Sequence, residues 1–372
     1  MKEIIRTLKP YIPEEPAEAV KERLGVERLV RLSANENPYG TSPLVREAIL
    51  SYVTHNDANY YPDGNASNLR MKLADYWQVQ PEQLVIGVGL DEVIAMVNKT
   101  LITAGDSIVV SVPAFSEYAL NGLVEGAEIR EVPADFETGQ YDFSALVKAV
   151  DETTRLVWIC NPNNPTGTYE SVEDIRKLVV AIPKETLVII DEAYIDFVTS
   201  VAVPTARALL DEFPNVAIMR TFSKAYGLAN YRVGYMMTPI ELANYMQTIR
   251  LPYNLNTLSQ VAAEAAFGDQ EFVARTVSQN AEERAKWESL FDELGIHYYK
   301  SEANFIFFAA PDAEGLAGAW LKSGYQVRRG QREGWLRLTI PMSQDGDVMR
   351  KILRDFMNKF VQNNVQFVIR FV

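Results

Sequence analysis

The sequence predicts an α/β fold in which a mainly parallel sheet lies between two layers of helices. Short apolar runs rich in β-branched residues alternate with segments of helical periodicity through about residue 250. Strands that are apolar throughout are buried on both faces, which is typical of parallel sheets covered by helices. Since 372 residues exceed the usual size of one hydrophobic core, the length favours two domains.

The large domain is expected at residues 36–265, where strands and helices alternate. Its strands are predicted, in chain order, at residues 83–89, 107–112, 155–160, 186–191 and 215–220. Helical patterns follow four of them, as DEVIAMVNKTL, SEYALNGLV, VEDIRKLVVAI and a segment that begins after about residue 238.

A smaller α+β domain is expected at residues 266–372. Its pattern consists of a long charged helix, FVARTVSQNAEERAKWESLFDELG, then NFIFFAA, a helix near residues 313–323, YQVRRG, WLRLTI and a last helix near residues 346–360. Residues 1–35 are too few to fold alone, so we expect an N-terminal arm that packs against one of the domains. The last dozen residues alternate in apolar character, which indicates either an edge strand or a segment foreign to the natural protein.

The composition argues against several classes of protein. A net charge of −13 with no basic run disfavours a nucleic-acid-binding surface. No stretch of about 18 apolar residues could span a bilayer, and the polar N-terminus does not resemble a signal peptide. Cys160 is the only cysteine, which excludes an internal disulfide and suits a cytoplasmic protein. With only two histidines beside it, the chain offers too few ligands for structural zinc, so we expect no metal.

Polar residues gather where the predicted strands end. Ligands of open parallel sheets bind beyond the carboxyl ends of the strands. Five polar segments lie at such ends, at residues 87–92, 113–118, 161–167, 191–194 and 221–224. Nucleotide binding is disfavoured, because Glu92 stands where a dinucleotide motif needs its third glycine and no phosphate-binding GxxxxGKS or GxxxxGKT sequence occurs. We therefore expect one crevice for another kind of ligand.

A lysine and an acid in these segments point to a particular cofactor. Lys224 is flanked by Phe222 and Tyr226 and lies near Arg232. Partial burial beside a cation lowers the pKa of a lysine, so that the neutral amine can bond to an aldehyde. Asp191 directly follows the apolar run LVII, and an acid in such a dry place needs a cationic partner, for example a protonated ring nitrogen. Pyridoxal phosphate requires this set together with an anion cradle.

The sequence also resembles a known family. NPNNPTG, DEAYIDF and TFSKAYGLANYRVGY, in that order and at these separations, resemble the motifs of fold type I pyridoxal-phosphate enzymes. SANENPYG, YYPDG, GVGLDEVI, PYNLN, NFIFF and WLRLTI are similar to segments of the histidinol-phosphate aminotransferase family. The similarity extends from Leu8 to about Phe360.

The resemblance implies roles for five residues around the cofactor ring. Lys224 would bond covalently to the cofactor and would then act as the acid and base of the reaction. Asp191 would keep the pyridine nitrogen protonated. Asn164 and Tyr194 would hydrogen-bond to the ring hydroxyl, and Phe115 would stack on the ring.

The resemblance also implies how two anions are bound. The residues that match ligands of the cofactor phosphate are Thr221, Ser223 and Arg232, with the backbone amides around Leu90 and Asp91 at a helix start. Tyr61 would reach the cofactor phosphate of a neighbouring subunit, which implies a homodimer. Arg328 and Arg337, helped by Tyr11, would bind the acidic end of the substrate, because guanidinium groups suit phosphate and carboxylate alike.

The reaction that the resemblance implies is amino transfer between L-histidinol phosphate and 2-oxoglutarate by a ping-pong mechanism. An aromatic amino acid aminotransferase is the alternative, since one arginine pair accepts carboxylates and an apolar pocket discriminates by only about 1 to 3 kcal/mol per small substituent. An amino-acid-phosphate decarboxylase and a cofactor-bound sensor are less favoured. Four departures from the family pattern border the phosphate and substrate regions: Leu90 for Ser or Ala, residues 230–231 for Gly and an apolar residue, Pro341 for Gly, and Glu14 for Gly.

Overall fold

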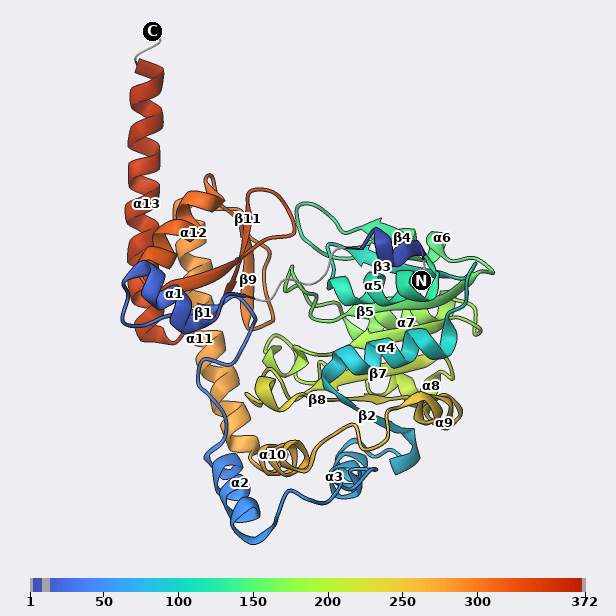
Figure 1. The fold of residues 1–372 in the computed structure, drawn as a ribbon. Coiled ribbons are helices and arrows are strands. Elements are labelled where there is room, and N and C mark those ends of the chain that lie inside the picture. The colour runs from blue at the N-terminus through green and yellow to red at the C-terminus, as the bar shows by residue number, and fades with distance from the viewer. Residues whose placement is uncertain (1–2, 9–13, 370–372) are drawn as a thin grey trace.

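The chain folds around two sheets, each packed with its own helices (Figure 1). The structure is a computed structural model that describes residues 3–8 and 14–369. Within these residues the large sheet has seven strands and the small sheet has four. Figure 1 shows the large sheet between helices and the small sheet beside it, flanked by the last helices of the chain.

The large sheet is mainly parallel, as predicted. In spatial order its strands are β2 (Leu84–Val88), β8 (Val233–Met237), β7 (Val216–Thr221), β6 (Leu187–Asp191), β5 (Thr154–Cys160), β3 (Ser107–Val112) and β4 (Glu128–Pro133). Only β8 runs against its described neighbours, β2 and β7. The five predicted strands are all present, and β4 and β8 are the two that the sequence pattern did not indicate.

Successive side chains of β5 enter cores on opposite faces of the sheet, as the two-residue period of a strand requires. Val157 and Ile159 pack on one face, and Leu156 and Trp158 pack on the other. The first face is covered by α3 (Ser67–Trp77), α6 (Phe143–Ala149), α7 (Val172–Ala181), α8 (Leu209–Glu212) and α10 (Thr257–Gly268). The second face is covered by α4 (Gly89–Leu101), α5 (Ser116–Glu125) and α9 (Ile240–Ile249).

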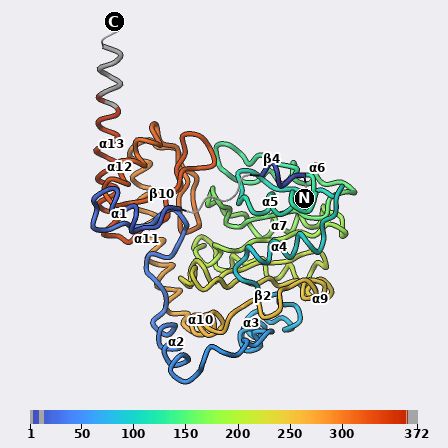
Figure 2. The backbone as a smooth tube through the Cα atoms, viewed as in Figure 1, coloured from blue at the N-terminus to red at the C-terminus, as the bar shows by residue number. Residues whose placement is uncertain are grey.

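Helix α7 illustrates how the sequence sets these elements. Ser171 caps its N-terminus, since the Ser171 hydroxyl accepts a hydrogen bond of 3.1 Å from the Asp174 amide. Ile175, Leu178 and Val179 then recur at the spacing of one helix face and are buried against the sheet. Helix α2 (Pro43–His55) packs against α10, far away in the sequence, and the two lie close together in the backbone view (Figure 2).

The small sheet is completed by the N-terminal segment. Its strands, in spatial order, are β1 (Val30–Leu32), β10 (Tyr325–Arg329), β11 (Trp335–Thr339) and β9 (Phe305–Ala309). Its helices are α1 (Ala17–Leu24), α11 (Gln270–Leu294), α12 (Ala313–Lys322) and α13 (Ser343–Ile369). Strand β1 pairs in parallel with β10, so the expected arm contributes a strand to the C-terminal sheet. The domain boundaries after residues 35 and 265 stay a prediction.

The last helix is longer than the sequence pattern predicted. Helix α13 runs through Ile369, so the edge strand considered for the last dozen residues is wrong over their described part. No glycine or proline occurs between residues 347 and 369 to end the helix. Along the described chain, no helix combines the length and the apolar character needed to cross a bilayer. Short 3-10 helices complete the fold at η1 (Glu3–Arg6), η2 (Pro81–Gln83), η3 (Ile195–Phe197) and η4 (Ala229–Tyr231).

Candidate active site

Six strands of the large sheet end at one edge. The strands β2, β3, β4, β5, β6 and β7 share one direction, so their carboxyl ends face the same way. The last residues of β5 and β6, Cys160 and Asp191, are register partners. Strand β8 runs in the opposite direction and therefore begins at this edge, directly after Arg232. The polar segments predicted to converge accordingly follow strands that end on the same side of the sheet.

Lys224 follows the end of β7 and is largely buried. Its Nζ donates a hydrogen bond of 2.9 Å to the Ala34 carbonyl, in the N-terminal segment, and lies 5.7 Å from the centre of the Tyr194 ring. Burial, followed by the positive charge of Arg337, lowers the pKa of Lys224 from 10.5 to about 8. A substantial fraction of this amine is therefore neutral, and thus nucleophilic, near physiological pH.

The lowered pKa predicts how the cofactor-free protein captures pyridoxal phosphate as the pH changes. Only the neutral amine attacks an aldehyde, so the rate of covalent capture should rise with pH and level off above about pH 8, where Lys224 loses its proton. Stopped-flow absorbance on the cofactor-free protein between pH 6 and pH 10 measures this rate. An ordinary lysine has a pKa of about 10.4, so capture by N-acetyl-lysine should still be rising at pH 10. A protein profile that follows the free amino acid would show that Lys224 is an unperturbed amine.

Asp191 is the last residue of β6 and is buried, with 3% of its surface exposed. The Tyr118 hydroxyl donates to its Oδ2 at 2.6 Å, and the Ala193 amide donates to its Oδ1 at 3.0 Å. Burial raises the pKa of Asp191 from 3.8 to about 6 despite these two donors. Among the described residues, no cationic side chain forms an ion pair with it. A buried carboxylate in this state is stabilised by any cation that a ligand brings, such as a protonated ring nitrogen.

The residues predicted to bind the cofactor phosphate lie together between β7, β8 and the start of α4. Arg232 Nη1 donates to the Ser223 hydroxyl at 3.4 Å, and Arg232 Nη2 lies 3.0 Å from Asp91 Oδ2. The Ser223 amide donates to the Thr221 hydroxyl at 3.0 Å. The first amides of α4, which include that of Leu90, have no partner within the helix and favour an anion.

Gly89 permits this arrangement. A Cβ built at Gly89 would lie 2.2 Å from Arg232 Nη2, and the residue has a φ of +72°. Replacing Gly89 with alanine is therefore expected to displace the Arg232 guanidinium and to weaken binding of pyridoxal phosphate roughly 10-fold to 100-fold, as the loss of a charge-assisted contact would. Gly295→Ala is the matched control, because Gly295 has a φ of +63° with nothing within 4 Å. Equal cofactor dissociation constants in the two variants would contradict this role of Gly89.

Arg337 connects the small sheet to this edge. Its Nη1 donates to Asn164 Oδ1 at 2.6 Å, and its Nη2 donates to the Ser33 carbonyl at 2.6 Å. The Tyr194 hydroxyl accepts a hydrogen bond of 3.1 Å from Asn35 Nδ2. Burial raises the pKa of Tyr194 to about 12, so its hydroxyl stays protonated and can donate to a ligand. Residues from both sheets thus meet beside Lys224.

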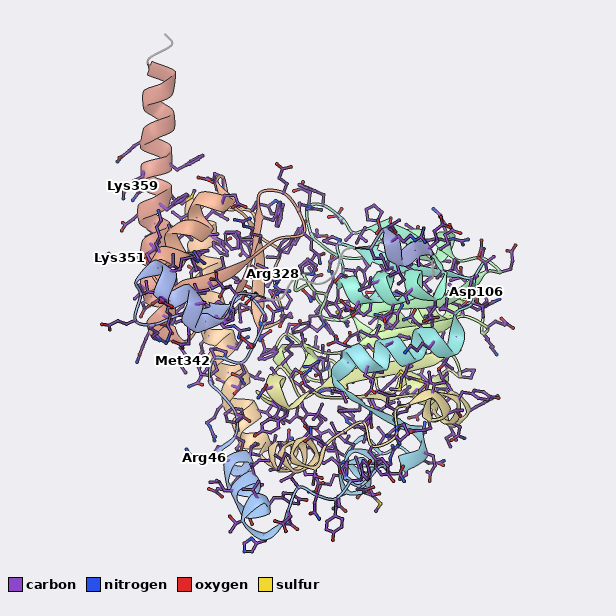
Figure 3. All side chains as sticks on the ribbon, in the orientation of Figure 1. Arg46, Asp106, Arg328, Met342, Lys351 and Lys359 are labelled. Atoms are coloured by element: carbon purple, nitrogen blue, oxygen red, sulfur yellow. The ribbon has the colours of Figure 1, made fainter. Side chains whose placement is uncertain are left out.

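The other predicted residues are less closely joined to this group. Phe115 lies at the start of α5, with its ring edge-on to Tyr118 at 5.6 Å between centroids. Arg328 lies on β10 of the small sheet (Figure 3). It is half-exposed, and its Nη1 lies 3.6 Å from Glu14 Oε1. Tyr61 is 80% exposed and stacks on Tyr253. The residue predicted to assist the arginines, Tyr11, falls outside the described residues.

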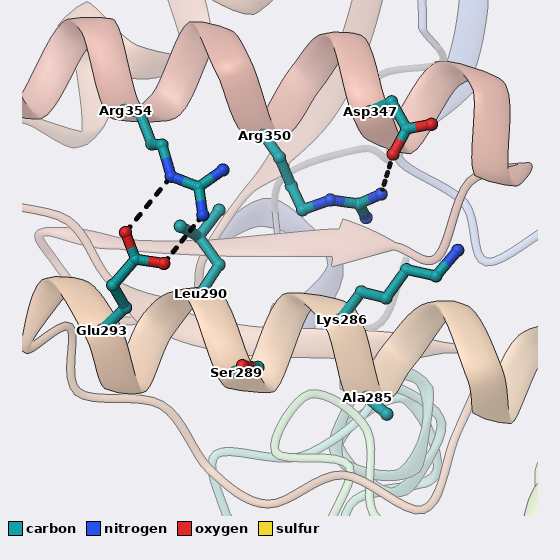
Figure 4. Close-up of a pocket in the computed structure, with 8 residues that line it drawn as sticks. All are labelled: Ala285, Lys286, Ser289, Leu290, Glu293, Asp347, Arg350 and Arg354. Atoms are coloured by element: carbon teal, nitrogen blue, oxygen red, sulfur yellow. Dashed lines mark hydrogen bonds and ion pairs between the residues drawn. The ribbon is translucent and has the colours of Figure 1, made fainter.

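A pocket elsewhere in the molecule does not belong to this group. A pocket of about 440 Å³ lies between α11 and α13 (Figure 4). Its charged residues are already paired, since Arg354 lies 2.7 Å from Glu293 and Arg350 lies 2.6 Å from Asp347. None of its lining residues follows a strand of the large sheet. We therefore place the candidate active site at the strand ends around Lys224.

The site fits pyridoxal phosphate on three observations. The Lys224 amine has a lowered pKa, and Asp191 is a buried acid without a described cationic partner. Arg232 lies next to the start of α4, where the first amides have no partner within the helix. These groups would hold, in turn, the aldehyde, the ring nitrogen and the phosphate of the cofactor.

The comparisons with known proteins agree with a site for pyridoxal phosphate. The chain matches the model of the aminotransferase class I and II family over residues 27–353, and it belongs to that family. It is a pyridoxal-phosphate-dependent aminotransferase with the fold type I architecture.

Individual relatives are similar to this chain over nearly its whole length. A histidinol-phosphate aminotransferase of Limosilactobacillus fermentum is 51% identical over 359 residues, which cover 96% of this chain and 99% of the relative. Another, from Lactiplantibacillus plantarum, is 48% identical with the same coverage. The solved structure of histidinol-phosphate aminotransferase from Sinorhizobium meliloti in complex with pyridoxal-5'-phosphate is 26% identical, with a TM-score of 0.86 over 97% of this chain and 98% of that chain.

Proposed function

We propose that the protein transfers an amino group between L-histidinol phosphate and 2-oxoglutarate, and that it does so in the cytoplasm. The observation that carries the proposal is the hydrogen bond from Arg337 to Asn164, which sets a guanidinium beside Lys224 and Tyr194. A substrate phosphate or carboxylate held there would have its amino group within reach of Lys224. The two relatives with 51% and 48% identity, both named histidinol-phosphate aminotransferases, support this substrate.

Each residue of the site has its own role in the proposed reaction. Pyridoxal phosphate, when bound, supplies an aldehyde that accepts the amino group and a ring that withdraws electrons. Asp191 would hold a proton on the ring nitrogen, and Tyr194 and Asn164 would hydrogen-bond to the ring hydroxyl. Lys224 Nζ removes the proton from the substrate carbon that bears the amino group, because its pKa of about 8 suits a base near neutral pH.

A homodimer is part of this proposal. Tyr61 and Tyr253 form a stacked and largely exposed pair, with ring centroids 4.7 Å apart. Leu50 and Val53 on α2 and Leu251 near Tyr253 are also exposed apolar side chains. We expect these side chains to gather in one apolar patch, because contiguous apolar surface marks a protein interface. Light scattering should give a mass close to twice the 41.9 kDa of one chain, and a single-chain mass would reject the dimer.

A half-reaction screen tests the proposed substrate. The holoenzyme is mixed with one amino donor at a time, and the change in cofactor absorbance is followed in a stopped-flow instrument. L-histidinol phosphate should react with the largest rate per unit concentration, ahead of phenylalanine, tyrosine and histidine, because only it brings a phosphate to the arginine pair. A faster reaction with phenylalanine would instead indicate an aromatic aminotransferase. Release of carbon dioxide from an amino-acid phosphate without any oxo acid would indicate a decarboxylase.

A further inference from the structure

The small sheet carries a row of polar side chains that begins at Arg337, beside the candidate active site. Arg328 and Arg337 are register partners on β10 and β11, so their side chains share one face of the sheet. Leu32 is the register partner of Val327, which places the next residue, Ser33, beside Arg328. The row that would bind the anionic end of a substrate therefore consists of Ser33, Arg328 and Arg337.

A carboxylate of the N-terminal segment already contacts this row. Glu14 Oε2 accepts a hydrogen bond of 2.9 Å from the Ser33 hydroxyl, and Glu14 Oε1 lies 3.6 Å from Arg328 Nη1. Glu14 Oε2 also lies 3.8 Å from Arg31 Nε. The Glu14 side chain is the more buried partner, with 18% of its surface exposed against 45% for Arg328. Glu14 thus adds a fixed negative charge to an otherwise cationic place.

Glu14 contacts Arg328 directly. Arg337, the second arginine of the row, donates to Asn164 Oδ1 and the Ser33 carbonyl. Arg31 lies 3.5 Å from Glu36 as well as 3.8 Å from Glu14, so Arg31 and Arg328 share the charge of Glu14. Glu14 therefore offsets part of the positive charge that the arginines bring to the row.

We propose that Glu14 is a specificity-determining residue that limits how strongly the arginine pair prefers dianions over monoanions. The interaction of a fixed charge with a bound ion scales with the charge of that ion, so Glu14 opposes a dianion twice as strongly as a monoanion in free energy. The inference rests on the proposed function, in which a phosphate monoester and an oxo acid bind alternately at one site. If the site binds the phosphate monoester and the oxo acid with comparable affinity, each of them can be released before the other binds.

The test compares two ions of similar shape and different charge on the holoenzyme, in which the cofactor fills the other phosphate site. Sulfate is a dianion and methanesulfonate is a monoanion throughout the neutral range. Calorimetry at constant ionic strength measures the dissociation constant of each ion. In Glu14→Gln this constant should fall about 3-fold for methanesulfonate and about 10-fold for sulfate. The second factor is about the square of the first, because the free-energy change doubles with the charge of the ion. Arg328→Gln should abolish most sulfate binding, which locates the ion. Equal factors for the two ions, or no change, would overturn the proposal.

Two matched variants separate the local charge from other effects. Glu15→Gln makes the same change in net charge one residue away, at an exposed ion pair of 2.7 Å with Arg23, and should leave both constants unchanged. Ser33→Ala removes the hydrogen bond that anchors Glu14 but keeps its charge, so the ratio of the two constants should stay near that of the parent. If either variant reproduces the Glu14→Gln ratio, Glu14 does not set the preference. Because inorganic ions are the probes, this result does not depend on which amino donor is the substrate.

Discussion

Replacing Lys224 with alanine is expected to abolish amino transfer and leave the fold intact. In the proposed reaction the variant loses both the amine assigned to bond with the cofactor and the base assigned to move the substrate proton, so the rate should fall roughly 10⁴-fold or more. The fold should tolerate the change, because the Lys224 side chain makes one hydrogen bond within the described residues, to the Ala34 carbonyl, and burial disfavours its charged form. Single-turnover absorbance with L-histidinol phosphate measures the rate, and circular dichroism checks the fold.

The covalent bond gives a second measurement for the same variant. Borohydride reduction followed by tryptic mapping should find a pyridoxyl group on the fragment that contains Lys224 in the parent and on no fragment of the variant. Lys177→Ala is the matched control, since Lys177 is an exposed lysine paired with Asp174 on α7 and should behave like the parent. A pyridoxyl group found at another lysine of the parent would refute the assignment.

The strands that the sequence predicted are those buried on both faces. β5 and β6 are apolar at nearly every position, because helices cover both of their faces. β4 escaped prediction because it is an edge strand, with Glu128 and Glu131 exposed. β8 escaped because its apolar run is broken by Gly234, where a Cβ would lie 2.8 Å from the Leu90 amide nitrogen. Gly234 lets β8 approach the start of α4 closely, and α4 lies far away in the sequence.

The candidate site was predictable where a residue lies at the end of a strand or in the loop that directly follows it. Lys224, Asp191 and Asn164 are of this kind, since the direction of the strands alone brings them to one edge. Tyr118 and Asn35 were missed, although they hydrogen-bond to Asp191 and Tyr194. These contacts span 73 and 159 residues, and no local pattern encodes them. The position of Tyr118 inside a polar segment at a strand end was the one available signal.

The Asp191→Asn variant is expected to lose most activity and to gain stability in the cofactor-free protein. The amide keeps the shape of the acid and can hydrogen-bond to both the Tyr118 hydroxyl and the Ala193 amide. It cannot hold a proton on a ring nitrogen, so the rate of proton removal from the substrate should fall about 10²-fold to 10⁴-fold. The same half-reaction measurement gives this rate.

The gain in stability follows from the sign of the pKa shift. The pKa of Asp191 is about 6 in the folded protein against 3.8 for the model acid, so between these values the folded state binds more protons than the unfolded state. The free energy of unfolding contributed by this group therefore falls as the pH rises from about 4 to about 6, by about 3 kcal/mol at most. The Asp191→Asn variant has no titrating group at this position, so its free energy of unfolding does not fall in this way. It should be more stable than the parent at pH 7 but not at pH 4.

Urea denaturation of the two cofactor-free proteins across pH 4 to 7 measures the difference in their free energies of unfolding. Adding pyridoxal phosphate should reverse the sign of this difference. A bound cation restores the partner that the buried carboxylate lacks, so the cofactor should stabilise the parent more than the variant. If Asp191→Asn is instead the less stable protein at pH 7 without cofactor, the carboxylate is already satisfied by Tyr118 and Ala193. In that case the assignment of Asp191 to the ring nitrogen would lose its electrostatic basis.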